Sequence, residues 1–231
     1  MESAKTRRNW IVGAIGSKGT GKTALARLLF RKHPRVIAVD PMSEYDGGFI
    51  VSGHLDTLDY LCGTKQFRVI YRPLDEADIA FACRTALAAR KCLLIIEELG
   101  RYCEPQSIPA ELDEVVTRGR HRCVDFLYTV QRFQMIHKNV SAMTDEFYIF
   151  RQFEAVDLEQ IDRRFGRIVA DQVRSLDDLE ALKINVKEFR PDDRESFSLV
   201  SIVPGVGVFN HRRAAKVAGA SDPVRASAVS N

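Results

Sequence analysis

The sequence predicts an α/β fold in which a mostly parallel central sheet is flanked by helices. Short apolar runs alternate with helical patterns along most of the 231-residue chain, as they do in successive βαβ units. One run, Cys92–Ile96, is apolar throughout, which is typical of a strand buried on both faces of a parallel sheet. The length suits a single domain with a substantial core, which we expect at residues 1–209.

The alternating elements occupy the first two-thirds of the chain. Apolar runs predict strands at residues 10–15, 36–40, 67–71, 92–96, 124–130 and 146–150. Apolar positions at helical spacing predict helices at residues 22–31, 75–90 and 111–117. Residues 42–66 are rich in Gly and Asp, so we expect loops with short elements there.

The rest of the chain follows a different pattern. Residues 156–165 and 168–182 look helical, in short pieces. Two further strands, at 184–189 and 197–203, are expected to form a short C-terminal β-hairpin around a polar turn. Residues 210–231 show no periodicity and contain Gly, Ala, Ser, Val and basic residues, so we expect a flexible basic tail.

Composition and charge exclude several classes of protein. Hydrophobic residues make up 45% of the chain and charged residues 28%, which excludes disorder over its whole length. The longest strictly apolar run has five residues, so we expect neither a membrane span nor a signal peptide. The net charge of +3 is carried by residues 204–231, so any nucleic-acid contact needs a local basic patch. Five cysteines without a CxxC pair favour a reducing compartment such as the cytosol.

The most specific motif is a glycine-rich loop between the first strand and the first helix. Its sequence, GSKGTGKT, fits GxxxxGK[ST] at every fixed position. Such a loop points backbone N–H groups at phosphates, and the helix N-terminus adds positive potential. The lysine can reach the β- and γ-phosphates, and the last threonine can offer its hydroxyl to Mg²⁺. We therefore expect ATP and Mg²⁺ to be bound by Gly16, Ser17, Lys18, Gly19, Thr20, Gly21, Lys22 and Thr23.

Two carboxylates follow the apolar run 92–96. A strand beside the glycine-loop strand would place Glu97 near Mg²⁺, usually through water, and Glu98 where it can orient and deprotonate an attacking water. This pair favours hydrolysis over phosphoryl transfer to a small hydroxyl acceptor. The first acid is Glu where most such motifs have Asp, so the division of roles between the two carboxylates stays open.

Arginines and a glutamine flank the next predicted strand. Arg118, Arg120 and Arg122 precede it in the segment RGRHR, and they suit a positive charge placed on a neighbour's γ-phosphate. Gln131 stands at its end and suits a polar sensor of the same phosphate or of the attacking water. The plainer alternatives are a solvated basic edge for the arginines and a turn-capping amide for Gln131.

The segments GSKGTGKT, LLIIEE, VVTRGRHRCVDFLYTVQR and FYIFR together resemble the FtsK–HerA superfamily of DNA-pumping P-loop ATPases. More narrowly, they look like the small genome-packaging ATPases of tailless icosahedral viruses. The resemblance covers roughly residues 10–165. The glycine loop is specific for nucleotide binding only, and the RGRH…QR part points to the superfamily.

The resemblance implies a RecA-like fold with an extra strand, tipped by Gln131, between the glycine-loop strand and the acidic strand. It implies an ATP-hydrolysing DNA translocase or packaging motor that forms a homo-oligomeric ring, commonly a hexamer, with ATP at the subunit interfaces. Arg120, or next Arg118, would be the finger acting in trans, and double-stranded DNA would pass through the pore. A capsid or membrane-vertex partner, and action in the host cytoplasm or the virion, would fit a viral origin.

Two other functions stay open. A small-molecule P-loop kinase would use the arginine cluster as a lid over the phosphates of the same chain. A nucleotide-dependent assembly or switch protein would bind ATP without the turnover of a motor. If the chain is a motor, pore contacts with DNA phosphates are expected from Arg101, Arg132 and Lys138, although ordinary surface charge explains each of them as well.

Overall fold

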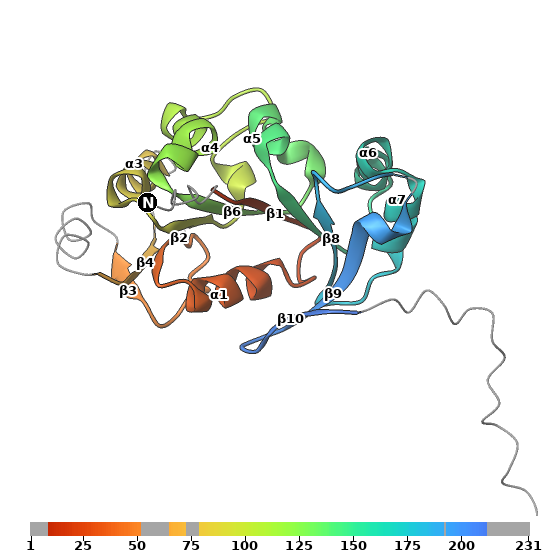
Figure 1. The fold of residues 1–231 in the computed structure, drawn as a ribbon, viewed down its shortest axis with the longest axis horizontal. Coiled ribbons are helices and arrows are strands. Elements are labelled where there is room, and N and C mark those ends of the chain that lie inside the picture. Colours follow the sequence, from red (N-terminus) through yellow and green to blue (C-terminus); the bar gives the residue numbers. More distant parts are fainter. Residues whose placement is uncertain (1–8, 52–64, 73–78, 192, 212–231) are drawn as a thin grey trace, which may run out of the picture.

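A ten-stranded sheet forms the centre of the computed structural model, which describes residues 9–51, 65–72, 79–191 and 193–211. The strand order is β10-β9-β8-β7-β1-β6-β5-β2-β4-β3. The first seven strands in the sequence pair in parallel, and the last three extend the sheet in antiparallel fashion beyond β7. The predicted α/β fold with a mostly parallel sheet is therefore confirmed (Figure 1).

The parallel strands are β1 (Ile11–Ile15), β2 (Arg35–Val39), β3 (Phe49–Val51), β4 (Phe67–Tyr71), β5 (Leu93–Ile96), β6 (Asp125–Val130) and β7 (Glu146–Phe150). The antiparallel strands are β8 (Glu180–Asn185), β9 (Phe197–Val203) and β10 (Gly207–Asn210). The helices are α1 (Lys22–Lys32), α3 (Ile79–Ala89), α4 (Ala110–Arg122), α5 (Lys138–Met143), α6 (Ala155–Phe165) and α7 (Arg167–Ser175). Short 3-10 turns, η2 (Leu99–Arg101), η3 (Phe133–Met135) and η4 (Arg194–Ser196), lie between them.

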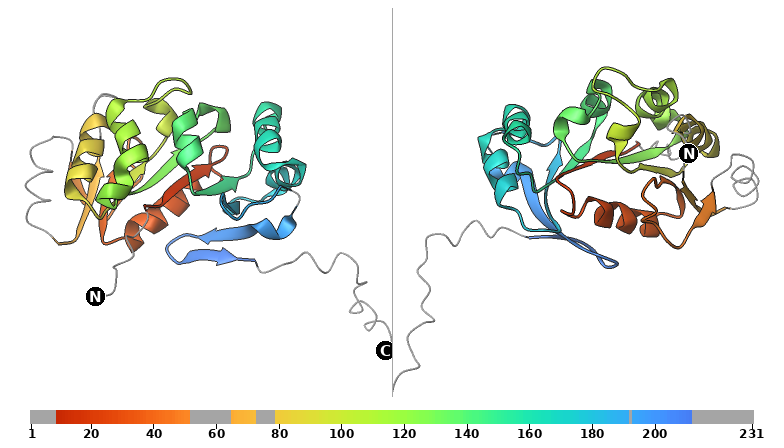
Figure 2. Two further views of the ribbon diagram at one scale, coloured as in Figure 1. Left: turned by 45° about the horizontal axis from the view of Figure 1, so that its top comes forward. Right: turned by 180° about the vertical axis from the view of Figure 1, so that it is seen from behind.

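Helices cover both faces of the sheet. In Figures 1 and 2, α3, α4 and α5 lie on one face, α1 lies on the other, and α6 and α7 lie beside the antiparallel strands. The protein has one hydrophobic core on each face of the sheet, and strand β1 contributes to both, because successive side chains of a strand point to opposite faces. Ile11 and Ile15 pack into the larger core with α3, α4 and α5, while Val12 and Ala14 pack into the smaller core above α1.

The inserted strand implied by the resemblance is present. β6 lies between β1 and β5, and its register aligns Ile15 with Val130 and Ile96 with Tyr128. Gln131 follows the last residue of β6 directly. The carboxyl ends of β1, β5 and β6, where the sequence places its predicted functional residues, therefore meet at one edge of the sheet.

The predicted end of the helix at residues 111–117 is wrong. α4 continues to Arg122, because its buried face, which includes Val115 and Val116, extends past residue 117 to Gly119. The helix ends where Cys123 takes a left-handed conformation with φ of 56°. The arginine cluster is thus helical and lies at the exposed C-terminal end of α4.

The predicted boundary between the last helix and the hairpin is also wrong. Residues 180–182, expected to be helical, begin β8, and β8 ends at Asn185 rather than at residue 189. Ala181 and Leu182 fit both a helical and a strand pattern in the sequence. The open edge of β7 decides between the two, because Ile149 pairs with Leu182. The strand that results places Ala181 in the smaller core and Leu182 in the larger core.

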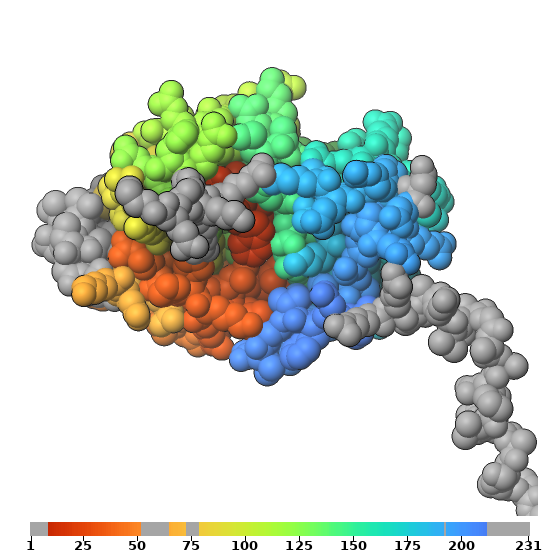
Figure 3. Space-filling model, viewed as in Figure 1, coloured from red at the N-terminus to blue at the C-terminus, as the bar shows by residue number. Residues whose placement is uncertain are grey.

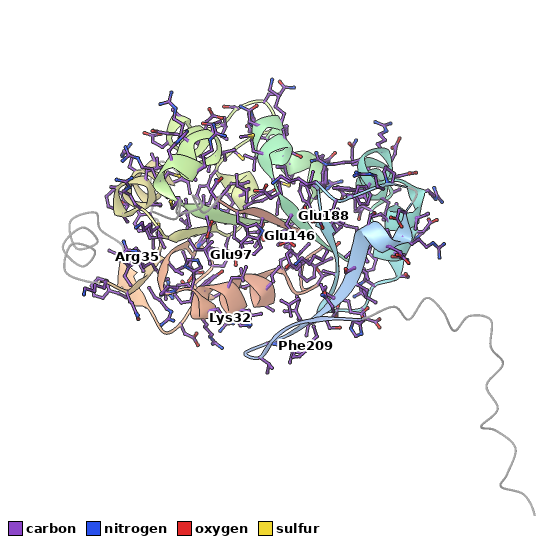
Figure 4. The ribbon with its side chains drawn as sticks, viewed as in Figure 1. Lys32, Arg35, Glu97, Glu146, Glu188 and Phe209 are labelled. Atoms are coloured by element: carbon purple, nitrogen blue, oxygen red, sulfur yellow. The ribbon has the colours of Figure 1, made fainter. Side chains whose placement is uncertain are left out.

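The hairpin that the sequence predicts is extended by a strand that it does not predict. β8 and β9 pair as expected, and β10 then pairs with β9, with Asn210 opposite Val200. Asn210, expected as the first residue of the tail, therefore belongs to β10, and residues 212–231 lie outside the described residues. Figure 3 shows the β9–β10 hairpin against α1, and Figure 4 labels Phe209 on it. No helix in the described ranges combines the length and apolarity that a bilayer crossing requires.

Candidate functional site

The carboxyl edge of the parallel sheet gathers the candidate site residues. The glycine loop follows β1, the two carboxylates follow β5, Gln131 follows β6, and Gln152 is the second residue after β7. In open α/β sheets, ligands bind at this edge because loops from several strands converge there. Figure 4 labels Glu97 near the middle of the sheet, above α1.

The glycine loop is closely wrapped and tied to two neighbouring strands. The backbone N–H of Gly16 donates to Val130 O at 3.2 Å, and that of Ser17 donates to Arg151 O at 3.1 Å. A Cβ at Gly16 would meet Phe150 Cβ at 2.5 Å, so glycine is required there by close packing. Gly21 has φ of 116° and precedes α1, a conformation that side chains disfavour. The sequence therefore shapes a cradle at the N-terminus of α1.

Lys22 is buried inside this cradle. Its side chain is 6% exposed, and its ammonium donates to Gly16 O at 2.7 Å and to Ser17 O at 2.9 Å. Burial lowers the pKa of Lys22, while the negative charges of Glu98 and Glu97 oppose that shift. An ammonium that donates to neutral loop carbonyls gains by exchanging them for negatively charged phosphate oxygens. The donor set thus fits a nucleoside triphosphate.

Glu97 is buried at the end of β5 and is held by two hydroxyl groups. It is 3% exposed; Oε1 accepts from Tyr45 Oη at 2.7 Å, and Oε2 accepts from Thr129 Oγ1. Burial raises the pKa of Glu97 to about 7, against the lowering effect of these two hydrogen bonds. Each oxygen keeps a lone pair, so Glu97 and the Thr23 hydroxyl at the start of α1 are the residues that could hold Mg²⁺.

We expect the Glu97→Gln variant to be more stable than the wild type at pH 8 and to lose that advantage near pH 5. The folded protein raises the pKa of Glu97 from 4.5 to about 7, so it binds more protons than the unfolded chain within this window. Stability therefore falls as pH rises through the window, by about 3 kcal/mol from this group. Urea unfolding of both proteins without nucleotide or Mg²⁺ measures the difference. Parallel pH profiles would contradict the assignment.

Glu98 is presented at the sheet edge rather than buried. It has a left-handed backbone with φ of 53°, and its N–H donates to Thr129 Oγ1 at 2.9 Å. Its carboxylate oxygens accept from Gln131 Nε2, each at 3.2 Å. A left-handed non-glycine residue costs about 1 kcal/mol, and such strain gathers at functional sites. The structure therefore brings together the predicted base and the predicted sensor.

The predicted arginine cluster lies at the opposite edge. β6 begins at Asp125, three residues after α4, and Lys91 N donates to Arg122 O at the amino ends of β5 and β6. Arg118 and Arg120 are exposed, and Arg120 lines a hollow of about 260 Å³ beside Ile11, the first residue of β1. A five-residue strand is about 17 Å long. These arginines are therefore remote from the glycine loop of their own chain.

The arginines that do follow the parallel strands are engaged with carboxylates of the same chain. Arg72 and Arg151 directly follow β4 and β7, and Arg132 lies two residues after the end of β6. Their contacts are Arg72 with Asp40 at 3.5 Å, Arg132 with the fully buried Asp157 at 3.0 Å, and Arg151 with Asp178. Among the predicted DNA contacts, Arg132 is therefore paired with Asp157 although its side chain is 41% exposed, and Arg101 and Lys138 are exposed.

Three residues of the site were missed by sequence reasoning. Tyr45 comes from the loop after β2, Thr129 from β6 and Gln152 from the segment after β7. Each is buried, and each hydrogen bonds to a predicted site residue. Thr129 had a usable signal, because it is a polar residue one position before the end of an apolar strand beside the acidic strand. Tyr45 and Gln152 carry no such pattern.

A loop of this geometry, opening a helix and facing a strand that ends in carboxylates, defines the P-loop NTPase fold. No protein-family model matches the sequence, and no curated protein matches it. Among solved structures, the chain is similar to the genome packaging NTPase B204 from Sulfolobus turreted icosahedral virus 2 in complex with ATP-gammaS. The TM-score is 0.67 and the identity 18%, over 84% of this chain and 98% of that chain.

Two further structures support the same fold. The DNA-packaging ATPase B204 from Sulfolobus turreted icosahedral virus gives a TM-score of 0.63 with 20% identity, over 82% of this chain and 95% of that chain. VirB4 of Thermoanaerobacter pseudethanolicus gives 0.55 with 12% identity, over 80% and 89%. The resemblance to genome-packaging P-loop ATPases that the sequence motifs carry is therefore confirmed at the level of the fold.

Proposed function

We propose that the chain is an ATP-hydrolysing DNA translocase or packaging motor. The observation that carries the hydrolytic part is the contact between Glu98 and Gln131 beside a glycine loop with a buried Lys22. The motor part is supported by the likeness to structures described as genome-packaging NTPases. A base next to an amide, both at the phosphate edge, suits the activation of a water molecule.

The roles follow from where each group lies. Lys22 would exchange the carbonyls of Gly16 and Ser17 for β- and γ-phosphate oxygens. Thr23 and Glu97 would hold Mg²⁺, which draws negative charge away from the phosphates when bound. Glu98 would take the proton of the attacking water, and Gln131 would orient that water or the γ-phosphate.

The position of the arginine cluster favours a shared site over a kinase lid. A lid must touch phosphates bound by its own chain, and Arg118 and Arg120 lie at the other edge of their own sheet. Three arginines at the phosphate edge, Arg72, Arg132 and Arg151, are paired with Asp40, Asp157 and Asp178. A finger supplied by a neighbouring copy fits both facts, so we propose a homo-oligomeric ring, a hexamer by preference, with ATP at the interfaces.

Double-stranded DNA is the proposed substrate of the motor. Arg101 is exposed near the phosphate edge and Lys138 is exposed on α5, and both remain candidate contacts with DNA phosphates. Arg132 remains a candidate as well, because its side chain is 41% exposed. The predicted basic tail at residues 210–231 would add salt-dependent affinity for DNA or for a capsid partner. Such a motor would act in the host cytoplasm or in the virion.

Assembly and DNA-stimulated hydrolysis together test the proposal. Mass photometry with ATP and Mg²⁺, with and without double-stranded DNA, should show a closed ring, and phosphate release without any added acceptor should rise with DNA. A monomer that hydrolyses ATP only with a small hydroxyl acceptor would favour the kinase. A protein that binds ATP without turnover would favour the assembly or switch function.

We expect the Glu98→Gln variant to bind ATP normally and to hydrolyse it at least about 10²-fold more slowly. The amide is isosteric with the carboxylate but cannot take the proton of the attacking water. Steady-state phosphate release and equilibrium binding of ATP-gammaS measure the two properties. The matched control is Glu104→Gln, on the exposed loop after η2, which should leave both unchanged. If Glu97→Gln blocks hydrolysis and Glu98→Gln does not, the roles of the two acids are reversed.

A further inference from the structure

Gln152 occupies a buried position between the glycine loop and the sensor strand. Its side chain is 1% exposed and lies two residues after the end of β7. Its Oε1 accepts from Ser17 Oγ at 3.0 Å, and its Nε2 donates to the backbone O of Gln131 at 2.8 Å. One neutral side chain thus joins the second residue of the glycine loop to the predicted sensor.

The chemistry of these partners fixes the orientation of the amide. A backbone carbonyl can only accept a hydrogen bond, so the NH₂ of Gln152 must face Gln131 O. The carbonyl of Gln152 must then face Ser17, whose hydroxyl is left to donate. A substitution of Gln152 that removed its carbonyl or its NH₂ group would leave a buried polar group of Ser17 or Gln131 unpaired, which is unfavourable.

The contacts on either side of Gln152 extend this connection to the base. The carbonyl of Val130 accepts from Gly16 N at 3.2 Å, so two successive carbonyls of the sensor segment are held, one by the glycine loop and one by Gln152. The side chain of Gln131 in turn donates to both oxygens of Glu98. Ser17, Gln152, Gln131 and Glu98 therefore form one continuous hydrogen-bonded series.

We propose that Gln152 is a positioning residue that couples the glycine loop to the sensor and so sets the orientation of Gln131 for hydrolysis. The inference rests on the proposed ATPase function and deepens it. Gln152 acts through the backbone of Gln131 and through Ser17, so its removal should slow the chemical step more than it weakens nucleotide binding. A shift of the glycine loop on phosphate binding would reach Glu98 by this route.

The first experiment is a double-mutant cycle. Gln152→Ala should lower kcat about 10-fold, the worth of one or two buried hydrogen bonds, with KM and ATP-gammaS affinity within about 3-fold of wild type. In a Gln131→Ala background the same substitution should cause no further loss of kcat, because Gln152 acts through Gln131. Asn185→Ala is the matched control, since its amide bonds to Lys187 N at the opposite edge of the sheet.

The second experiment separates the two halves of the amide. The carboxylate introduced by Gln152→Glu can accept from Ser17 but cannot donate to Gln131 O, whereas its protonated form can do both. Burial raises the pKa of such a carboxyl, so kcat relative to wild type should rise as pH falls toward 5. The same ratio for Gln152→Ala should stay flat with pH.

The outcomes are distinct. Loss of kcat at unchanged affinity, absent in the Gln131→Ala background and recovered at low pH by Gln152→Glu, would support the inference. Equal loss of binding and kcat, or full additivity with Gln131→Ala, would overturn it and leave the ATPase proposal standing. A wild-type protein without turnover in the same assay would overturn both. Thermal unfolding of each variant shows whether it folds. If Gln152→Ala does not fold, the double-mutant cycle with Gln131→Ala is repeated with Ser17→Ala, which removes the other partner of the Ser17–Gln152 hydrogen bond.

Discussion

Lys22→Ala is expected to abolish ATP turnover and to weaken binding of the triphosphate. The ammonium of Lys22 lies within the loop and contacts the carbonyls of Gly16 and Ser17, where phosphate oxygens would replace them. Removing one preorganised donor from a reacting group costs on the order of 10²–10³-fold in rate, and Lys22 also carries a full charge. Phosphate release at saturating ATP should therefore fall to the background of the assay.

Lys32→Ala provides the matched control for this variant. Lys32 lies at the other end of the same helix, and its ammonium is near Gly207 of the β9–β10 hairpin rather than near the phosphate edge. The Lys32→Ala variant should keep turnover and ATP-gammaS affinity within about 2-fold of wild type. The substitution removes only one exposed charge at the C-terminal end of α1, away from the glycine loop. Normal turnover by Lys22→Ala would remove the ATPase proposal altogether.

The phosphate edge could be predicted from the sequence because its signals are local. The glycine loop must stand between a strand and a helix, and the carboxylates must end a strand that is buried on both faces. Both patterns are read within short windows, and the structure brings Lys22, Glu98 and Gln131 to one edge. The resemblance also implied the place of β6 between β1 and β5, which no local pattern gives.

The supporting residues could not be predicted, because their roles depend on contacts between distant segments. Tyr45 bonds to Glu97 across 52 residues, and Gln152 bonds to Ser17 across 135. Neither belongs to a spacing pattern, and a buried glutamine after a strand is indistinguishable in sequence from a loop amide. The same reason explains the shift of β8, whose start is set by the open edge of β7.

Arg120→Ala is expected to lower ATP turnover by about 10³–10⁵-fold, the usual contribution of an arginine finger, with Arg118→Ala the next candidate. Both arginines lie at the exposed end of α4, about 17 Å or more from the glycine loop of their own chain. Their removal should therefore leave nucleotide binding to the isolated chain intact. Arg163→Ala, which removes an exposed i,i+4 ion pair with Glu159 on α6, is the control and should turn over normally.

Mixing two inactive variants decides whose arginine completes the site. In a ring assembled from equal amounts of Arg120→Ala and Lys22→Ala, about a quarter of the head-to-tail interfaces combine an intact glycine loop with an intact arginine. Turnover should then recover toward about a quarter of the wild-type rate per subunit. Arg118→Ala and Arg122→Ala are each mixed with Lys22→Ala in the same way. The finger is the arginine whose variant is inactive alone and recovers on mixing. A finger that acts within its own chain gives no recovery at any ratio and activity independent of protein concentration, and that result would replace the shared-site motor with the kinase.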